Sequence, residues 1–339
     1  MIGLQNELVR GAGKAADLQT TEPAAPGGNG ESQIWRDGNI GKKPRYLIDS
    51  QSVINLNSDF GHKRLCSNAT FTAGHACTFS CSFCYVETMM RKNARLNALL
   101  ENEGLQHEQV VVEINDPVSA VRAQLLFDDG TPRYKDSKDK RVIYASPLVD
   151  VAGTRPQMEV TIAICREILQ HTHWQIRLLS KCVLLVKIAE ALQDHKQRMI
   201  YGFSTGTLDD EVTRSFEIGT TSVSERLKAL KQLQADGYRT FGMLCPILPQ
   251  SDYAAFAKKV AREINIERCE DIWAESLNAR GDALRDTSAA LRRKDFKRAG
   301  ELAGRRGGRP RGLGQLRGAD LPGAHQGHPG QEAALPAIR

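Results

Sequence analysis

The sequence lacks a hydrophobic run long enough to cross a membrane. Its 339 residues are 41% hydrophobic, which is ordinary for a globular protein, and no apolar stretch approaches the roughly 20 residues that a membrane span requires. The first residues also lack the basic region followed by an apolar stretch that marks a secretory signal. We therefore expect a cytoplasmic protein without a membrane partner.

Most of the chain also lacks an excess of positive charge. Residues 1–284 carry 34 Lys and Arg against 35 Asp and Glu, whereas residues 285–339 carry 12 against 5. The formal net charge of +6 therefore belongs to the C-terminal segment. Proteins that bind nucleic acid usually present a basic surface to the phosphates, so the charge of the main part gives no support for a nucleic-acid groove.

Cysteine is scarce, but three of its eight occurrences stand close together. Cys77, Cys81 and Cys84 form the pattern C-x3-C-x2-C, while the others are scattered without the spacing of a disulfide framework. Randomly placed cysteines would give this pattern only about 0.005 times in a chain of this length, so chance is a poor explanation. Three thiolates on one short loop can bind three irons of a four-iron cluster, which leaves the fourth iron free for a small molecule.

Two other interpretations of the three cysteines stay open. They could belong to a structural zinc site, with His75 or Cys66 as the fourth ligand. They could also share one face of a helix, because their spacing corresponds to i, i+4 and i+7. Gly74 before the motif and the aromatic residues Phe83 and Tyr85 favour a loop in an apolar pocket, which would shield a cluster from water.

Strand and helix patterns alternate after the cysteine motif. Strands are expected at residues 141–146, 174–180, 199–204, 238–245 and 271–277, and helices at 86–103, 158–170, 183–192 and 224–235. Ser222 and Glu225 form a candidate capping box at the start of the last of these helices, and Gly237 marks its end. Repeated β–α units predict an α/β fold with a parallel sheet and helices outside it.

The two ends of the chain differ in composition from the part between them. Residues 1–45 are rich in Gly, Pro and Ala, and we expect them to be disordered. Residues 46–290 form the expected core domain. Residues 291–339 form a basic tail rich in Gly, Arg and Pro, which we also expect to be disordered. Its composition is that of GC-rich DNA translated out of frame, so a frameshift and a genuine basic arm are both open interpretations.

The cysteine spacing resembles the signature of the radical S-adenosylmethionine (SAM) superfamily. Later segments resemble its spore photoproduct lyase-like branch, also described as DNA repair photolyase-like proteins. These segments are LLSK at 178–181, YGFSTGT at 201–207, FEIGTTS at 216–222, GMLCPILP at 242–249 and ESLNARG at 275–281. The resemblance extends over roughly residues 65–290.

The resemblance implies a fold, two cofactors and a chemistry. The fold is a partial (β/α)6 TIM-like barrel with its active site at the C-terminal ends of the strands. Cys77, Cys81 and Cys84 would bind a 4Fe-4S cluster whose open iron chelates SAM. An electron from a donor such as a flavodoxin or ferredoxin would cleave SAM to a 5′-deoxyadenosyl radical. That radical would abstract hydrogen from a substrate that the sequence does not identify, with nucleic acid, protein and small molecules all open.

Polar and aromatic residues near the expected strand ends are the candidate SAM or substrate contacts. They are Phe83, Tyr85, Ser146, Asp150, Ser180, Lys181, Ser204 and Thr205. Packing beside the loop is an equal alternative for the aromatic residues, and turn capping or solvation at a strand end is one for the others. Glu217 is expected to brace a loop together with Arg226.

Spore photoproduct lyase uses a cysteine as hydrogen donor, and the resemblance makes Cys165, Cys182 and Cys245 candidates for that role. Two alternatives to an active radical SAM enzyme remain at this point. One is a non-catalytic protein that binds zinc or a partner, and the other is a truncated, inactive member of the family.

Overall fold

The computed structural model describes residues 33–50, 52–60, 65–145, 147–248, 250, 252–277 and 282–293. The candidate contact Ser146 lies outside the described residues, as do residues 1–32 and 294–339. The expectations of disorder and of a frameshift in those two terminal segments are therefore not addressed by the structure.

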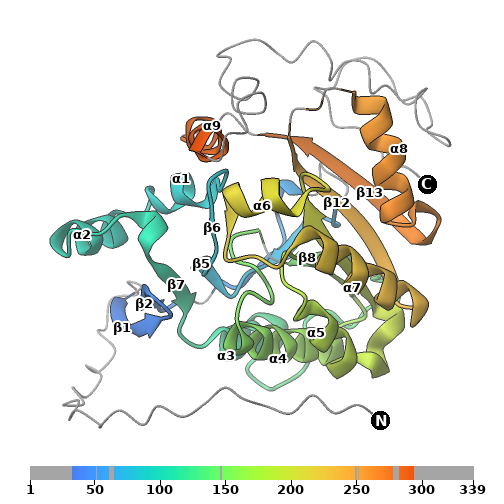
Figure 1. The fold of residues 1–339 in the computed structure, drawn as a ribbon. Coiled ribbons are helices and arrows are strands. Elements are labelled where there is room, and N and C mark those ends of the chain that lie inside the picture. Colours follow the sequence, from blue (N-terminus) through green and yellow to red (C-terminus); the bar gives the residue numbers. More distant parts are fainter. Residues whose placement is uncertain are drawn as a thin grey trace, which may run out of the picture. The chain divides into compact units, whose positions relative to one another are not determined.

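The core of the fold is a sheet containing six parallel strands that lie side by side in chain order (Figure 1). These strands are β4 (Ala69–Phe71), β8 (Val142–Ala145), β9 (Gln175–Ser180), β10 (Met199–Thr205), β12 (Arg239–Ile247) and β13 (Cys269–Ser276). A short strand, β3 (Ile54–Asn55), extends the sheet by pairing antiparallel with β4. Sequential order in a parallel sheet results when each strand is followed by a crossover that returns to the next position. The predicted α/β fold with a parallel sheet is confirmed.

Helices form most of the crossovers between the parallel strands. They are α3 (Pro117–Leu125), α4 (Arg155–His171), α5 (Leu185–Ala191), α6 (Asp210–Phe216), α7 (Val223–Ala235) and α8 (Tyr253–Glu263), and α9 (Ala283–Arg293) follows the last strand. Short 3-10 helices occupy His107–Gln109, Gln193–Arg198 and Ile266–Arg268. The Ser222 side chain accepts from the Glu225 backbone N–H at 3.4 Å at the start of α7, and Gly237 follows its end with φ of +73°.

The expected single helix over residues 86–103 is wrong. The structure has two helices there, α1 (Val86–Met90) and α2 (Ala94–Asn102). The break has a local cause, because Asn93 is in an extended conformation and its side chain accepts from the Leu96 backbone N–H at 3.1 Å. Asn93 therefore starts a new helix instead of continuing the first one.

The expectation of disorder over residues 1–45 is wrong for residues 34–45. β1 (Ile34–Ile40) and β2 (Lys43–Ile48) form an antiparallel hairpin whose turn contains Gly41 at φ of +61°. The hairpin belongs to a four-stranded sheet that continues with β7 (Val111–Ile114) and β5 (Gly74–Ala76). β2 pairs parallel with β7, so its order depends on partners about 65 residues away in the chain. The other end also differs from the expected boundary at residue 290, because α9 continues to Arg293.

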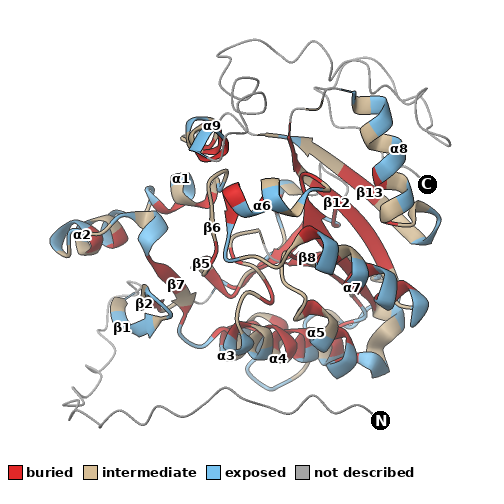
Figure 2. Cartoon of the chain, in the orientation of Figure 1, coloured by how far each residue is buried: buried red, intermediate tan, exposed pale blue. Residues whose placement is uncertain are grey.

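The two faces of the parallel sheet pack differently. Because side chains alternate along a strand, one face of the sheet packs against the helices and the other forms a separate apolar cluster. That second cluster contains Leu65, Cys66, Tyr144, Ile200, Phe241, Met243 and Trp273. In Figure 2 most of β12 is coloured as buried, whereas much of β13 is intermediate. Within the described part of the chain, no helix is both long and apolar enough to span a bilayer.

Candidate functional site

Cys77, Cys81 and Cys84 lie on a loop that leads away from the C-terminal end of β4, the first parallel strand. The loop continues through β5 into the short strand β6 (Ser80–Cys81) and turns where the Cys84 backbone N–H donates to the Cys81 carbonyl at 3.1 Å. Helix α1 begins only at Val86. The three cysteines therefore do not share a helix face, and that interpretation is wrong.

Residues far along the chain hold the cysteine loop in place. β6 pairs antiparallel with β11 (Glu217–Ile218), so that Cys81 is opposite Glu217. The Ser82 backbone N–H donates to the Phe216 carbonyl at 2.9 Å, and the rings of Phe83 and Phe216 lie 5.6 Å apart. The loop is thus fixed by a segment more than 130 residues away.

Helix α9 covers the same loop from another direction. Thr287 is fully buried, and its Oγ1 lies 3.2 Å from the Ser82 Oγ in a hydrogen bond. Leu291 packs in an apolar cluster that includes Phe83, Phe216 and Leu248. The last described helix is therefore part of the environment of the three cysteines.

The three cysteines line one cavity of about 360 Å³. Other charged or titratable residues that line it are Lys43, Glu87, Arg91, His107, Glu108, Asp282, Arg285 and Asp286. Lys43, at the start of β2, donates from Nζ to the Phe79 carbonyl in the loop at 3.1 Å. Lys43 was not a predicted site residue, because it lies in the segment that was expected to be disordered, and no local pattern marks it.

Burial and neighbouring charges shift the pKa values of the groups in the loop. Burial is the main reason why the pKa of the Cys77 thiol is raised to about 11, and the charges of Cys84 and Asp150 contribute to the rise. Burial also raises the pKa of Cys81 well above its usual value, whereas Lys181 lowers it. Burial lowers the pKa of Lys43, and all three cysteines oppose that shift. Two lysines from opposite parts of the chain therefore face the loop.

Neither candidate for a fourth zinc ligand, His75 or Cys66, lines the cavity with the three cysteines. A structural zinc site requires four ligands around one ion. Among the described residues, no group of three or more His, Cys, Asp or Glu side chains is placed to hold a metal ion. Cys66 packs instead in the apolar cluster with Tyr144, away from the zinc role considered for it.

Asp150 and Ser180 bind each other at the ends of β8 and β9. The Asp150 carboxylate accepts from the Ser180 Oγ at 2.6 Å, from the Lys181 backbone N–H at 2.8 Å and from the Ala152 backbone N–H at 2.9 Å. Burial raises the pKa of Asp150, and these hydrogen bonds oppose the rise. The geometry is that of turn capping, the alternative to direct SAM contact.

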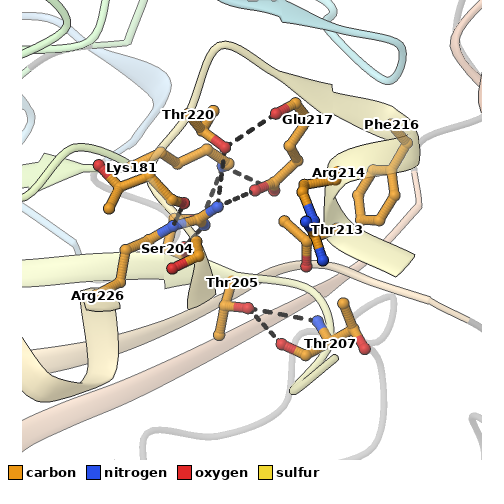
Figure 3. Close-up of polar contacts among 12 residues, drawn as sticks. Lys181, Ser204, Thr205, Thr207, Thr213, Arg214, Phe216, Glu217, Thr220 and Arg226 are labelled. Atoms are coloured by element: carbon orange, nitrogen blue, oxygen red, sulfur yellow. Dashed lines mark hydrogen bonds and ion pairs between the residues drawn. The ribbon is translucent and has the colours of Figure 1, made fainter. Parts of the chain in front are cut away.

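Lys181, Ser204 and Thr205 are also engaged by the protein itself (Figure 3). The Lys181 Nζ donates to the Ser204 Oγ at 2.9 Å, and the Ser204 Oγ donates to the Cys245 carbonyl at 3.0 Å. The Thr205 Oγ1 donates to the Thr207 carbonyl. The structure therefore brings Lys181 and Ser204 together, as two adjacent strand ends predict, but neither lines the cavity of the three cysteines.

The two aromatic candidates pack beside the loop. Phe83 contacts Phe216 and lies under the Lys181 ammonium, whose Nζ is 5.2 Å from the ring centroid. The Tyr85 hydroxyl donates to the Pro147 carbonyl beyond the end of β8. None of the seven described candidate contacts lines the cavity that contains the three cysteines.

The expected brace between Glu217 and Arg226 is present. Arg226 is fully buried and donates to Glu217 Oε2, to the Thr220 Oγ1 at 3.0 Å, to the Ser204 carbonyl at 2.5 Å and to the Thr221 carbonyl at 2.7 Å. Because Glu217 pairs with Cys81, this buried arginine connects α7 and the end of β10 to the cysteine loop.

The three other candidate cysteines lie in different places. Cys165 is fully buried on α4, outside the sheet. Cys182 follows the end of β9, and its backbone N–H donates to the Ser180 Oγ at 2.9 Å. Cys245, on β12, packs against the second apolar cluster, which contains Phe241 and Trp273. Its Sγ donates to Glu275 Oε2 at 3.7 Å. Of the three, Cys245 is the one on the face of the sheet opposite the helices.

Comparisons with known proteins bear on the fold. No protein-family model and no curated protein matches the sequence. Spore photoproduct lyase complexed with dinucleoside spore photoproduct matches with a TM-score of 0.50 and 15% identity, over 73% of this chain and 66% of that chain. A tyrosine-to-phenylalanine variant of spore photoproduct lyase matches with a TM-score of 0.51 and 14% identity, over 72% of this chain and 65% of that one. This chain thus spans slightly less than two thirds of the length of those proteins, and at such identity the likeness concerns the fold. The described chain has the α/β fold of spore photoproduct lyase, as its sequence resemblance predicts.

Proposed function

We propose that the protein is a radical SAM enzyme whose Cys77, Cys81 and Cys84 bind a 4Fe-4S cluster. The observation that carries the proposal is the position of the cysteine loop. It leaves the C-terminal end of the first of six parallel strands, and its three cysteines line one cavity. C-terminal strand ends are where enzymes built on parallel β/α units place their active sites.

The residues of this chain have separable roles in the proposed site. Cys77, Cys81 and Cys84 supply the thiolates, and no other cysteine lines the cavity among the described residues. A cluster held by these three thiolates would leave one iron free to bind SAM. It would supply the electron for cleavage of SAM to methionine and a 5′-deoxyadenosyl radical, which would take hydrogen from the substrate. The pairing of β6 with β11 and the contact with α9 hold the loop in place.

Nucleic acid is the substrate class that the fold neighbour suggests, since that neighbour is complexed with a dinucleoside spore photoproduct. The balanced charge of residues 1–284 gives this extension no support. A nucleic-acid pull-down with the full chain at two salt concentrations tests it.

A flavodoxin or ferredoxin is the proposed electron donor, and the cytoplasm is the proposed compartment.

Metal analysis of the reconstituted protein tests the proposed cluster. Anaerobically reconstituted wild type should contain about four iron and four sulfide per chain. Cys77→Ala, Cys81→Ala and Cys84→Ala should each lose this content. Cys269→Ala is the matched control and should retain it, because Cys269 hydrogen-bonds to the Ile264 carbonyl at the far end of β13. One zinc per chain without sulfide would support the zinc-binding alternative instead.

A further inference from the structure

A group of three buried charged side chains (Figure 3) includes Glu217, the strand partner of Cys81 in the cysteine loop. It consists of Lys181, Glu217 and Arg226, whose side chains are 15%, 1% and 0% exposed. We call this group the Lys181 triad. Two cations share one carboxylate, so the triad carries one net positive charge. A buried charge without a full counter-charge is costly, which raises the question of what balances it.

Within the triad, the positive charge of Arg226 is neutralised and that of Lys181 is not. Arg226 binds Glu217 Oε2 directly. Glu217 Oε1 is buried without a hydrogen-bond partner among the described residues and lies 3.8 Å from the Lys181 Nζ. The hydrogen-bond acceptors of the Lys181 ammonium are neutral, the Ser204 Oγ at 2.9 Å and the Cys245 carbonyl at 3.4 Å. Lys181 is therefore the less directly paired of the two cations, and the buried carboxylate of Asp150 also interacts with its charge.

The geometry directs this charge toward the loop. The Lys181 Nζ is 5.2 Å from the ring centroid of Phe83, which stands between Cys81 and Cys84. Glu217, the neighbour of Lys181, is the strand partner of Cys81. Lys43, which faces the loop from the hairpin side, binds the Phe79 carbonyl instead.

We propose that Lys181 is a positioning residue that serves as the fixed counter-charge of the cysteine loop, and that Glu217 moderates its effect. This inference rests on the proposed function, because it requires a cluster on the three cysteines. A cluster becomes more negative on reduction, and a nearby buried cation stabilises the reduced form more than the oxidised form. Lys181 should therefore raise the reduction potential of the cluster, and Glu217 should lower it.

Potentiometric titration of the reconstituted protein without SAM, followed by EPR or absorbance, tests the inference. Lys181→Met should move the midpoint potential to a more negative value, and Lys181→Arg, which keeps the charge, should stay near wild type. Glu217→Gln should move the potential to a more positive value. Lys187→Met is the matched control, because the Lys187 side chain is 62% exposed and pairs with Glu190 on α5. The cluster in this variant should have the midpoint potential of the wild type.

Shifts of the midpoint potential in opposite directions in Lys181→Met and Glu217→Gln distinguish an electrostatic role from a structural one. Structural damage to the loop would not depend on whether the removed charge is positive or negative. Equal potentials in wild type and Lys181→Met, or shifts of the same sign in both variants, would overturn the inference. If Lys181→Met holds no cluster, Glu217→Gln decides alone, and a potential that is unchanged or more negative overturns the inference. Iron and sulfide analysis separates the two proposals. If the wild type binds no cluster, the proposed function and this inference are both refuted. If the wild type binds the cluster but the midpoint potential does not respond to the charge changes, the inference alone is refuted.

Discussion

Replacing the buried Arg226 by methionine should strongly destabilise the fold. The change keeps most of the side-chain volume and removes the charge and five N–H donors. It leaves the carboxylate of Glu217, which is 2% exposed, without its direct partner. It also leaves the Ser204 carbonyl and the Thr221 carbonyl without the donors that they have in the wild type.

The expected loss follows from this arrangement. Removing one partner of a buried ion pair typically costs about 3–5 kcal/mol of unfolding free energy. In the variant, the Lys181 Nζ still lies 3.8 Å from the other carboxylate oxygen of Glu217 and compensates part of its unpaired negative charge. We therefore expect a loss of about 3 kcal/mol, the lower end of that range. The measurement is urea unfolding followed by far-UV circular dichroism.

Two further variants control the Arg226→Met measurement. Arg262→Met removes an arginine whose side chain is 75% exposed, and it should change the unfolding free energy by less than about 0.5 kcal/mol. The double variant Arg226→Met/Glu217→Gln removes both charges and should regain part of the loss. A loss below about 1 kcal/mol in Arg226→Met, or no gain in the double variant, would refute the reasoning that the pair is a buried brace.

Two other predictions concern α9 and the helix that precedes β9. Leu291→Ala should reduce the unfolding free energy by about 2–4 kcal/mol and speed the loss of the cluster in air, because fully buried Leu291 joins α9 to the loop. Cluster decay equal to that of Leu169→Ala, which changes a buried leucine near the C-terminal end of α4, would argue against the cover by α9. Arg122 hydrogen bonds lower the pKa of Glu167, so Glu167 stabilises the fold above about pH 4.5, and this contribution is lost as the pH falls through the lowered folded-state pKa. The difference in unfolding free energy between wild type and Glu167→Gln should therefore shrink on acidification, and a difference that is constant from pH 7 to pH 3 would contradict this assignment.

The elements that depend on local pattern were predictable. The parallel strands β8, β9, β10, β12 and β13 each carry a short run of apolar residues between polar turns, and each was expected at nearly the observed position. The cysteine loop was predictable because its spacing is itself the chemical signal. The Glu217–Arg226 brace followed from the resemblance of the segments that contain these residues.

The features that were missed depend on contacts between distant segments. The hairpin of β1 and β2 looks disordered in composition, and its order comes from pairing with β7. Lys43 reaches the cysteine loop only because of that pairing. The hydrogen bond between Asp150 and Ser180 also joins distant segments, and the sequence gives no information on it; their expected contact with SAM stays a prediction.

The most direct test of the proposed function is SAM cleavage by the reconstituted full chain under anaerobic conditions with a strong one-electron reductant. Wild type should release 5′-deoxyadenosine and methionine in equal amounts, as measured by chromatography and mass spectrometry. Cys77→Ala, Cys81→Ala and Cys84→Ala should release neither, while Cys269→Ala should match wild type. Intact SAM after prolonged incubation with wild type whose four-iron content and reduction have been verified would contradict the account.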